Sequence, residues 1–153
     1  MQRQLIIGMA AALVAGSSIA DEPVRQNYFN DPFLQVTNAL PACPRQDGPL
    51  ITFEEMQAQA HYRAERGTSC FRSGRCRLPN AFMYDREIIP RVKQAILSDG
   101  RFAETSVWVE GQRRWVFLKG CVANGGQSQA IEALVRNIDD VESVINQLTV
   151  INP

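Results

Sequence analysis

The chain has 153 residues, of which 45% are hydrophobic and 21% are charged, with sixteen basic and sixteen acidic side chains. This length and composition suit one modest globular domain with some additional polypeptide and exclude a large multidomain enzyme. The balanced charge of the whole chain favours neither a nucleic-acid partner nor an electrostatic attraction to membranes.

The first twenty residues carry the pattern of an export signal. Arg3 precedes an apolar run at positions 5–14, and Ser18 and Ala20 place small residues where a signal peptidase reads. We predict cleavage after Ala20 and export of the mature chain, in solution or associated with the membrane. Because the apolar run is about half the ~20 residues that a spanning helix needs, we expect no transmembrane segment in the mature chain.

All four cysteines lie in the part predicted to be exported, where thiols usually oxidise. Four cysteines allow three pairings. Cys70 and Cys76 flank a short turn-forming stretch, so we favour a disulfide between them. This leaves Cys43 to pair with Cys121 in a long-range link, although spacing alone does not fix the connectivity.

Residues 21–50 carry five prolines and no sustained periodicity, which predicts an extended, irregular arm. The arm is too apolar for a solvated linker, so we expect it to lie on another part of the chain. Its apolar side chains are those of Tyr28, Phe29, Phe33, Leu34, Val36 and Leu40.

A helix is predicted at 52–66, where Thr52 and Glu55 have the spacing of a capping box and Gly67 ends the element. The residues from Gly67 to Asn80 are predicted to form a loop.

A second helix is predicted from Asp85, as its cap, to Gly100. Because proline is tolerated mainly in a first helical turn, Pro90 places the start of the regular helix near Ile88. The apolar stripe of this helix is Ile88, Ile89, Val92 and Ile96.

The stretch VWVEGQRRWVFLKGCV predicts a hairpin. A two-residue turn at 111–112 places Trp108 opposite Trp115 and Glu110 opposite Arg113, which matches aromatic with aromatic and charge with charge. Strand alternation puts Val107, Val109, Val116, Leu118 and Val122 on one face, and Trp108, Trp115, Phe117, Lys119 and Cys121 on the other.

A third helix is predicted to begin at Gln127 or Ser128, and a last strand at 143–151. From Asp85 onward the predicted order is therefore helix, strand, strand, helix, strand, which is an α+β fold.

This order, together with the signals VFLKGCV and VESVINQLTV, resembles the BON domain, a small bacterial module, over residues 84–151. The most telling residues are Leu118, Gly120 and Val122 in the second strand, and Val141, Val144, Asn146, Leu148 and Val150 around the last strand. The resemblance implies one αββαβ unit with its helices on one face of a small sheet. It also implies a non-enzymatic periplasmic module that associates with phospholipid or envelope components. Cys121 departs from the family pattern.

The resemblance divides the chain into a signal peptide at 1–20, an extension at 21–83 and a BON-like domain at 84–153. In such a unit the face of Trp108 and Trp115 carries no helix. A contiguous apolar surface of this kind is rarely left bare, so we expect the arm to cover it, with Cys43 linked to Cys121. Phe29, Phe33, Leu34 and the first helix would then form a second core, and an open partner site is the alternative.

Five arginines gather near the predicted small disulfide, and we expect them to bind phospholipid headgroups or an acidic periplasmic protein. These arginines are Arg63, Arg66, Arg72, Arg75 and Arg77, and Trp108 and Trp115 are the aromatic candidates for the same surface. The alternative is a solvated face, because Glu54, Glu55 and Glu65 lie close enough to offset the charge.

No catalytic site, metal site or cofactor is expected, and no nucleic-acid partner. His61 is the one histidine and lacks the further ligands of a zinc site or a third catalytic partner. A thiol-disulfide enzyme is an alternative, but the chain has no Cys-x-x-Cys motif. A subunit of a ring-forming or secretion-type assembly is another, because small αββαβ modules recur there, so an oligomer is a possible state.

Overall fold

The computed structural model describes residues 22–151, so the predicted export signal and its cleavage after Ala20 lie outside the described residues. The helices are α1 (Phe53–Arg72), the short 3-10 helix η1 (Ala81–Tyr84), α2 (Asp85–Asp99) and α3 (Gly125–Arg136). The strands are β1 (Phe33–Gln35), β2 (Ser106–Gln112), β3 (Trp115–Val122) and β4 (Ser143–Val150). Between residues 22 and 151, no helix combines the length and apolar character required to cross a membrane.

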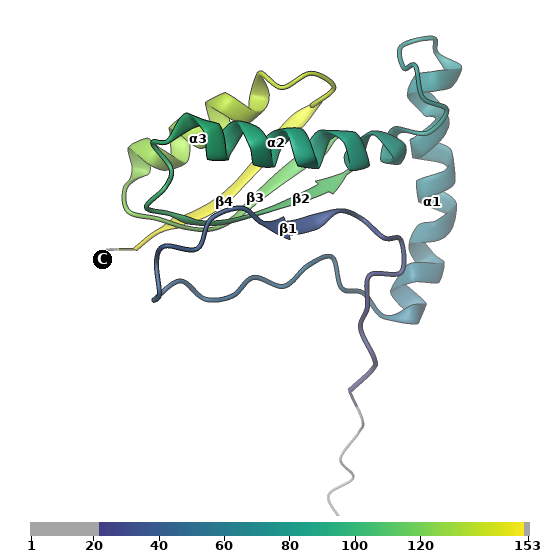
Figure 1. The fold of residues 1–153 in the computed structure, drawn as a ribbon. Helices are drawn as coiled ribbons and strands as arrows, with labels where there is room; N and C mark the ends of the chain where they lie inside the picture. Colours follow the sequence, from purple (N-terminus) through teal and green to yellow (C-terminus); the bar gives the residue numbers. More distant parts are fainter. Residues whose placement is uncertain (1–21, 152–153) are drawn as a thin grey trace, which may run out of the picture.

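The four strands form one mixed sheet in the order β1-β2-β3-β4. β2 pairs antiparallel with β1 and β3, and β4 pairs parallel with β3 across the α3 connection, which is the crossover that a parallel pair needs. Figure 1 shows α2 and α3 lying together on one face of this sheet. The arrangement confirms the predicted α+β fold.

The core lies between the sheet and helices α2 and α3. It contains the predicted helical stripe and the predicted aliphatic face of the hairpin, because period-3.6 and period-2 patterns both direct their apolar side chains there. The fully buried members include Ile88, Ile89, Val92, Ile96, Val107, Val109, Val116, Leu118, Val122, Ile131 and Val135.

The turn between β2 and β3 differs from the prediction. Its two residues are Arg113 and Arg114, with φ angles of 56° and 66°, and Gln112 lies opposite Trp115. The predicted turn at 111–112 is therefore wrong by two residues. Because an even displacement leaves every side chain on the same face of a strand, the two predicted faces of the hairpin are nevertheless right.

Contacts with α2 explain this register. The carboxylate oxygens of Asp85 accept hydrogen bonds from the backbone N–H groups of Arg113 and Arg114, each at 2.7 Å. A Cβ atom on Gly111 would lie 2.7 Å from Cγ1 of Ile89, so glycine at this position lets α2 approach β2. Gly111 thus serves helix packing and not the turn.

Helix α1 has the predicted capping box, with Glu55 N donating to Thr52 Oγ1 and Thr52 N donating to the Glu55 carboxylate. It continues to Arg72, beyond the predicted end at Gly67. Gly67 is buried inside the helix, and a Cβ atom there would overlap the side chain of Asn80. The glycine therefore allows close packing against the segment before η1 and does not end the helix.

Helix α2 begins at Asp85 and continues through Pro90, so the predicted start near Ile88 is wrong. The 3-10 helix η1 leads directly into α2 and supplies the preceding turn. Gly100, with φ of 72°, ends the helix as predicted. Helix α3 begins at Gly125, two or three residues before the predicted start, because the side chain of Asn124 caps it by accepting from Gln127 N.

The arm enters the sheet as well as covering it. Strand β1 pairs with the outer edge of β2, with Leu34 opposite Val109. After residue 40 the chain turns back and runs below the sheet, on the side away from α2 and α3 (Figure 1). Trp108 is only 6% exposed beneath this cover, whereas Trp115 and Phe117 stay partly exposed. The arm thus shelters the β2 part of the outer face and leaves the β3 part more open.

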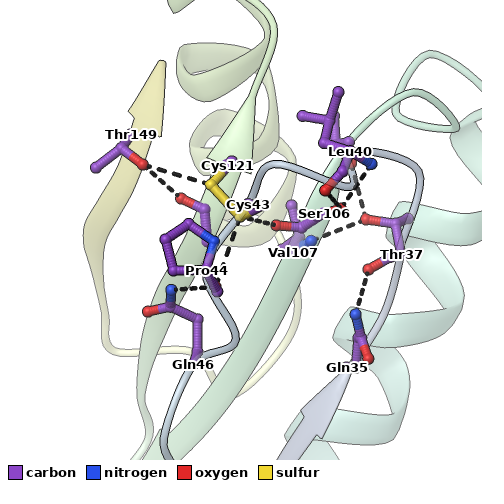
Figure 2. The surroundings of a disulfide bond; sticks show 12 residues. Gln35, Thr37, Leu40, Cys43, Pro44, Gln46, Ser106, Val107, Cys121 and Thr149 are labelled. Atoms are coloured by element: carbon purple, nitrogen blue, oxygen red, sulfur yellow. Dashed lines mark hydrogen bonds between the residues drawn. A yellow bond between two sulfur atoms is a disulfide. The ribbon is translucent and has the colours of Figure 1, made fainter. Parts of the chain in front are cut away.

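The structure contains both favoured disulfides, Cys43–Cys121 and Cys70–Cys76. Figure 2 shows Cys43 reaching the outer face of β3, next to contacts that fix the same part of the arm on β2. Leu40 N donates to Ser106 Oγ at 2.9 Å, and Val107 N donates to Thr37 Oγ1 at 3.0 Å (Figure 2). The long-range disulfide therefore joins an arm that is already hydrogen-bonded to the sheet.

Replacing Cys43 and Cys121 together with alanine is expected to lower the free energy of unfolding by about 4 kcal/mol, because their 78-residue separation closes a long loop in the unfolded chain. The matched control replaces Cys70 and Cys76, which are 6 residues apart, and is expected to cost about 2 kcal/mol. Urea denaturation followed by tryptophan fluorescence measures both values. Equal losses in the two double variants would contradict this explanation.

Candidate functional site

The structure separates Arg63 from the other predicted arginines. Its guanidinium donates to both carboxylate oxygens of Asp31, at 2.7 and 2.6 Å, and Arg63 as a whole is 8% exposed. The guanidinium carbon also lies 3.9 Å from the ring centroid of Phe29 and 4.0 Å from that of Phe82. Arg63 therefore makes an internal contact between the arm and α1, and it does not join the other predicted arginines.

The arm and α1 were predicted to form a second apolar core, but the buried contact between them is the Arg63–Asp31 ion pair. On α1, Phe53 is 55% exposed, and only Arg63 and Gly67 are buried. Burial raises the pKa of Asp31 and lowers the pKa of Arg63, while the attraction between the two charges opposes both shifts. The side chain of Asn27 holds the backbone of Asp31 through two hydrogen bonds, so the arm presents its carboxylate to α1 in a fixed position.

Two predicted arginines and two unpredicted ones meet in a hollow of about 410 Å³. Arg66 comes from α1 and Arg75 from the loop after it, while Arg113 and Arg114 come from the β2–β3 turn. The other lining residues are Ser69, Cys70, Ala81 and Glu142. We call this the arginine hollow. Its charged lining of four arginines and one glutamate has a net charge of +3.

The walls of the arginine hollow are held in place. The Nε group of Arg114 donates to the backbone oxygen of Asp140 at 2.8 Å, and its Nη1 group lies 3.3 Å from Cys76 Sγ. The Arg75 backbone N–H donates to Cys70 O at 2.9 Å, which closes the loop that carries Arg75. The Arg114 side chain and the backbone that carries Arg75 are therefore held in place before an anion enters the hollow.

The turn that delivers Arg113 and Arg114 depends on Asp85. Both turn residues have positive φ angles, a conformation that costs free energy for residues other than glycine and persists where surrounding contacts enforce it. Burial raises the pKa of Asp85 to about 7, and the hydrogen bonds from Arg113 and Arg114 N–H oppose this shift. The carboxyl group of Asp85 is thus bonded to the backbone of two cationic residues of the hollow.

The remaining predicted residues lie outside the hollow or are inaccessible. Arg72 is exposed on the last turn of α1, and Arg77 pairs with Glu87 and Asp140, so neither contributes to the lining. Trp108 is buried beneath the arm and does not form an exposed contact surface. Trp115 was predicted to share a surface with the arginines, and it lies beside one arginine of the hollow. The guanidinium of Arg113 is 5.0 Å from its ring centroid.

Sequence reasoning missed Arg113 and Arg114 because it placed them in a strand. The adjacent arginines are visible in the hairpin sequence. With the predicted turn at 111–112, however, both would belong to the second strand, and nothing would place them near the loop that contains Cys70. His61 is exposed and lies 3.3 Å from Glu65, its helical neighbour. Among residues 22–151, no group of three histidine, cysteine or acidic side chains could hold a metal ion.

Comparison with known proteins gives one family match. The family model of the BON domain matches residues 84–152, in a single copy. This range begins at the last residue of η1 and includes α2, α3 and strands β2 to β4. No curated protein matches the chain.

Replacing Arg63 with alanine is expected to lower the free energy of unfolding by about 3 to 5 kcal/mol, because Asp31 would be left buried without its partner. The double change Arg63→Met with Asp31→Asn removes both charges and is expected to recover part of this loss. Arg72→Ala, on the exposed face of α1, should change the stability by less than about 0.5 kcal/mol. Chemical denaturation distinguishes these results, and a loss for Arg63→Ala no larger than that for Arg72→Ala would contradict a structural ion pair.

The contribution of Asp85 to the free energy of unfolding is expected to fall as the pH rises from about 4 to about 7. The folded-state pKa of about 7 exceeds the ordinary value of 3.8, so in this interval the folded chain keeps a proton that the unfolded chain has released. Each unit of pKa shift corresponds to about 1.4 kcal/mol.

Denaturation curves of the wild type and Asp85→Asn, measured at several pH values, test this expectation. The pKa of Asp31 is also raised, but Asp31 is present in both proteins, so the difference between the two profiles isolates Asp85. The variant should gain stability relative to the wild type as the pH rises. A constant difference from pH 4 to pH 7 would rule out the titration of Asp85 in this range.

Proposed function

Because residues 84–152 form a single BON domain, we propose that this protein is a non-catalytic module of the cell envelope that binds anionic phospholipid headgroups through its arginine hollow. BON domains are generally non-enzymatic, and the family suggests a periplasmic or envelope-associated module. The two disulfides fit an oxidising compartment outside the cytoplasm.

The observation that carries this proposal is the convergence of four arginines in one hollow with a single acidic side chain. Guanidinium groups match the geometry of phosphate oxygens and can donate two parallel hydrogen bonds to them. A basic residue near an anionic membrane surface contributes about 1 kcal/mol to binding. The charge is concentrated at this point, although the chain as a whole has no net charge.

The surroundings of the hollow support a headgroup as its ligand. Trp115 is partly exposed and lies beside Arg113, and tryptophan is a residue that favours the boundary between apolar and aqueous phases. The lining of the hollow is itself mainly polar, which suits a phosphate better than an acyl chain. In this proposal the headgroup enters the hollow while its acyl chains stay in the bilayer.

Flotation with vesicles containing an anionic phospholipid, compared with vesicles of a neutral phospholipid, tests the proposed function. The wild type is expected to float with the anionic vesicles only. The double variant Arg66→Gln with Arg113→Gln removes two cationic groups from the hollow and should weaken binding about 30-fold, since two contacts are worth about 2 kcal/mol. Arg114 is left unchanged because it also holds the backbone of Asp140.

The matched control is Arg45→Gln with Arg72→Gln, which makes the same change in charge at two exposed positions outside the hollow. This variant should keep nearly the wild-type affinity. Equal losses in the two double variants would show that binding depends on overall charge and not on the hollow. Failure of the wild type to float with either vesicle would reject the lipid and leave an acidic protein as the ligand to test.

A further inference from the structure

A second hollow lies where the arm, α1, η1 and the start of α2 meet. Its volume is about 460 Å³, which falls within the range typical of small-molecule sites. Most of its lining is apolar, in contrast to that of the arginine hollow, and Met83 of η1 is 49% exposed beside it. We call it the aromatic hollow. Its apolar lining residues are Phe29, Pro32, Ala64, Phe82 and Met83.

The guanidinium of Arg63 keeps N–H groups for a ligand in this hollow. Its Nη2 group donates to both carboxylate oxygens of Asp31, and no partner of its Nε or Nη1 group is found among residues 22–151. These two groups are not sealed in the interior, because the fully enclosed side-chain atom without a hydrogen bond in that range is Nε1 of Trp115. Arg63 is 8% exposed and lines the aromatic hollow, so the hollow is the open space that these donors reach.

The charges that line the aromatic hollow match a single negative charge. Asp31 neutralises Arg63, while Arg86 is exposed at the start of α2 and forms none of the ion pairs found between residues 22 and 151. The charged lining of two arginines and one aspartate therefore has a net charge of +1. A carboxylate balances this charge and fits the planar fork of a guanidinium. A phosphate monoester, with a charge of about −1.5 to −2, exceeds it.

Two asparagine side chains supply groups that can pair with a peptide unit. Asn30 and Asn80 both line the aromatic hollow. The Oδ1 atom of Asn80 accepts from Phe82 N at 2.9 Å, which fixes the amide group, and the part of the chain at 22–151 offers its Nδ2 group no partner. A side-chain amide can donate to a peptide C=O and accept from a peptide N–H. These groups favour a ligand that carries an amide as well as a carboxylate.

We propose that the aromatic hollow binds the C-terminal residue of a polypeptide that ends in an aromatic side chain. The terminal carboxylate accepts hydrogen bonds from the free N–H groups of Arg63 and pairs with Arg86. The aromatic ring packs among Phe29, Phe82 and Met83, since aromatic and thioether groups interact favourably with it. The last peptide unit bonds to the asparagine amides. This site is separate from the arginine hollow, so it does not depend on the proposed lipid binding.

Titration of the full chain with acetyl-Gly-Phe, which ends in a free carboxylate, tests the site. Binding is expected with a Kd of about 1 mM or tighter. With carbon-13 in the methionine methyl groups, the NMR signal of Met83 should shift, while that of Met56, on α1 outside the hollow, should not. The amide form of the peptide lacks the charge and should bind about tenfold more weakly. The ion 3-phenylpropanoate lacks the peptide unit and should bind about fivefold more weakly.

Single changes show whether binding occurs in the aromatic hollow. Ala64→Leu places a larger side chain at its wall and should weaken binding of acetyl-Gly-Phe about tenfold, and Arg86→Gln removes the unpaired cation and should weaken it about threefold. The matched controls are Ala58→Leu on α1 and Lys93→Gln on α2, at exposed positions outside the hollow. Both controls should bind as the wild type does. Arg63 is left unchanged because its loss would destabilise the fold.

Several results would overturn the proposal. These are an unchanged Met83 signal at about 10 mM acetyl-Gly-Phe, equal affinities for its acid and amide forms, or equal losses for Ala64→Leu and Ala58→Leu. Equal affinities for the peptide and 3-phenylpropanoate would reject a polypeptide terminus as the ligand. Ala64→Leu should still float with anionic vesicles, and Arg66→Gln with Arg113→Gln should still bind the peptide, so failure of one site is distinguished from failure of the other.

Discussion

The carboxylate of Asp85 connects the first turn of α2 to the β2–β3 turn, and much of the remaining geometry follows from this contact. It accepts two backbone hydrogen bonds from Arg113 and Arg114 and so stabilises a turn with two positive φ angles. This turn sets the pairing of β2 with β3. Strand β4 then pairs with β3, so its position follows from that of β3. Gly111 completes the contact by allowing α2 to lie close to β2. One buried acid thereby stabilises the turn that sets the register of β2 with β3 and that carries two arginines of the hollow.

The extension (the residues before the segment that the BON family model matches) and the domain (that segment) are bound to each other at several independent points. Strand β1 adds to the sheet, and Cys43 is bonded to Cys121. The hydroxyl of Tyr84 accepts hydrogen bonds from the backbone N–H groups of Arg77 and Leu78, at 2.7 and 3.0 Å. The Arg63–Asp31 pair then fixes α1 to the arm. The strand pairing, the long-range disulfide and the Tyr84 hydrogen bonds join the extension to the domain, and the Arg63–Asp31 pair holds the extension together.

The arginine hollow depends on this union. Arg66 and Arg75 belong to the extension, whereas Arg113 and Arg114 belong to the BON domain. Neither part of the chain alone supplies all four arginines that line the hollow. The extension thus supplies two of the four arginines, and the β2–β3 turn supplies the other two, so residues between 22 and 83 have a part in the proposed function.

The sequence by itself determined the features that depend on local pattern. Alternation sorted the faces of β2 and β3, helical spacing identified the stripe of α2, and the capping box located the start of α1, because each of these signals is read from residues a few positions apart. The helix–strand–strand–helix–strand order and the αββαβ unit were also predictable. The disulfides were predictable to the extent that a short spacing singled out Cys70 and Cys76 and left one remaining pair.

Only the tertiary structure decided the register of the hairpin, the role of the glycines and the membership of the site. Gly67 was predicted to end the first helix, and Gly111 was predicted to form the hairpin turn. Each instead makes room for a side chain distant in sequence. Arg63 looked like one more surface cation, but its partner Asp31 lies 32 residues earlier. The physical reason is the same in each case. The free energy of these residues depends on contacts between segments far apart in the chain, and such contacts leave no periodic signal in the sequence around either residue.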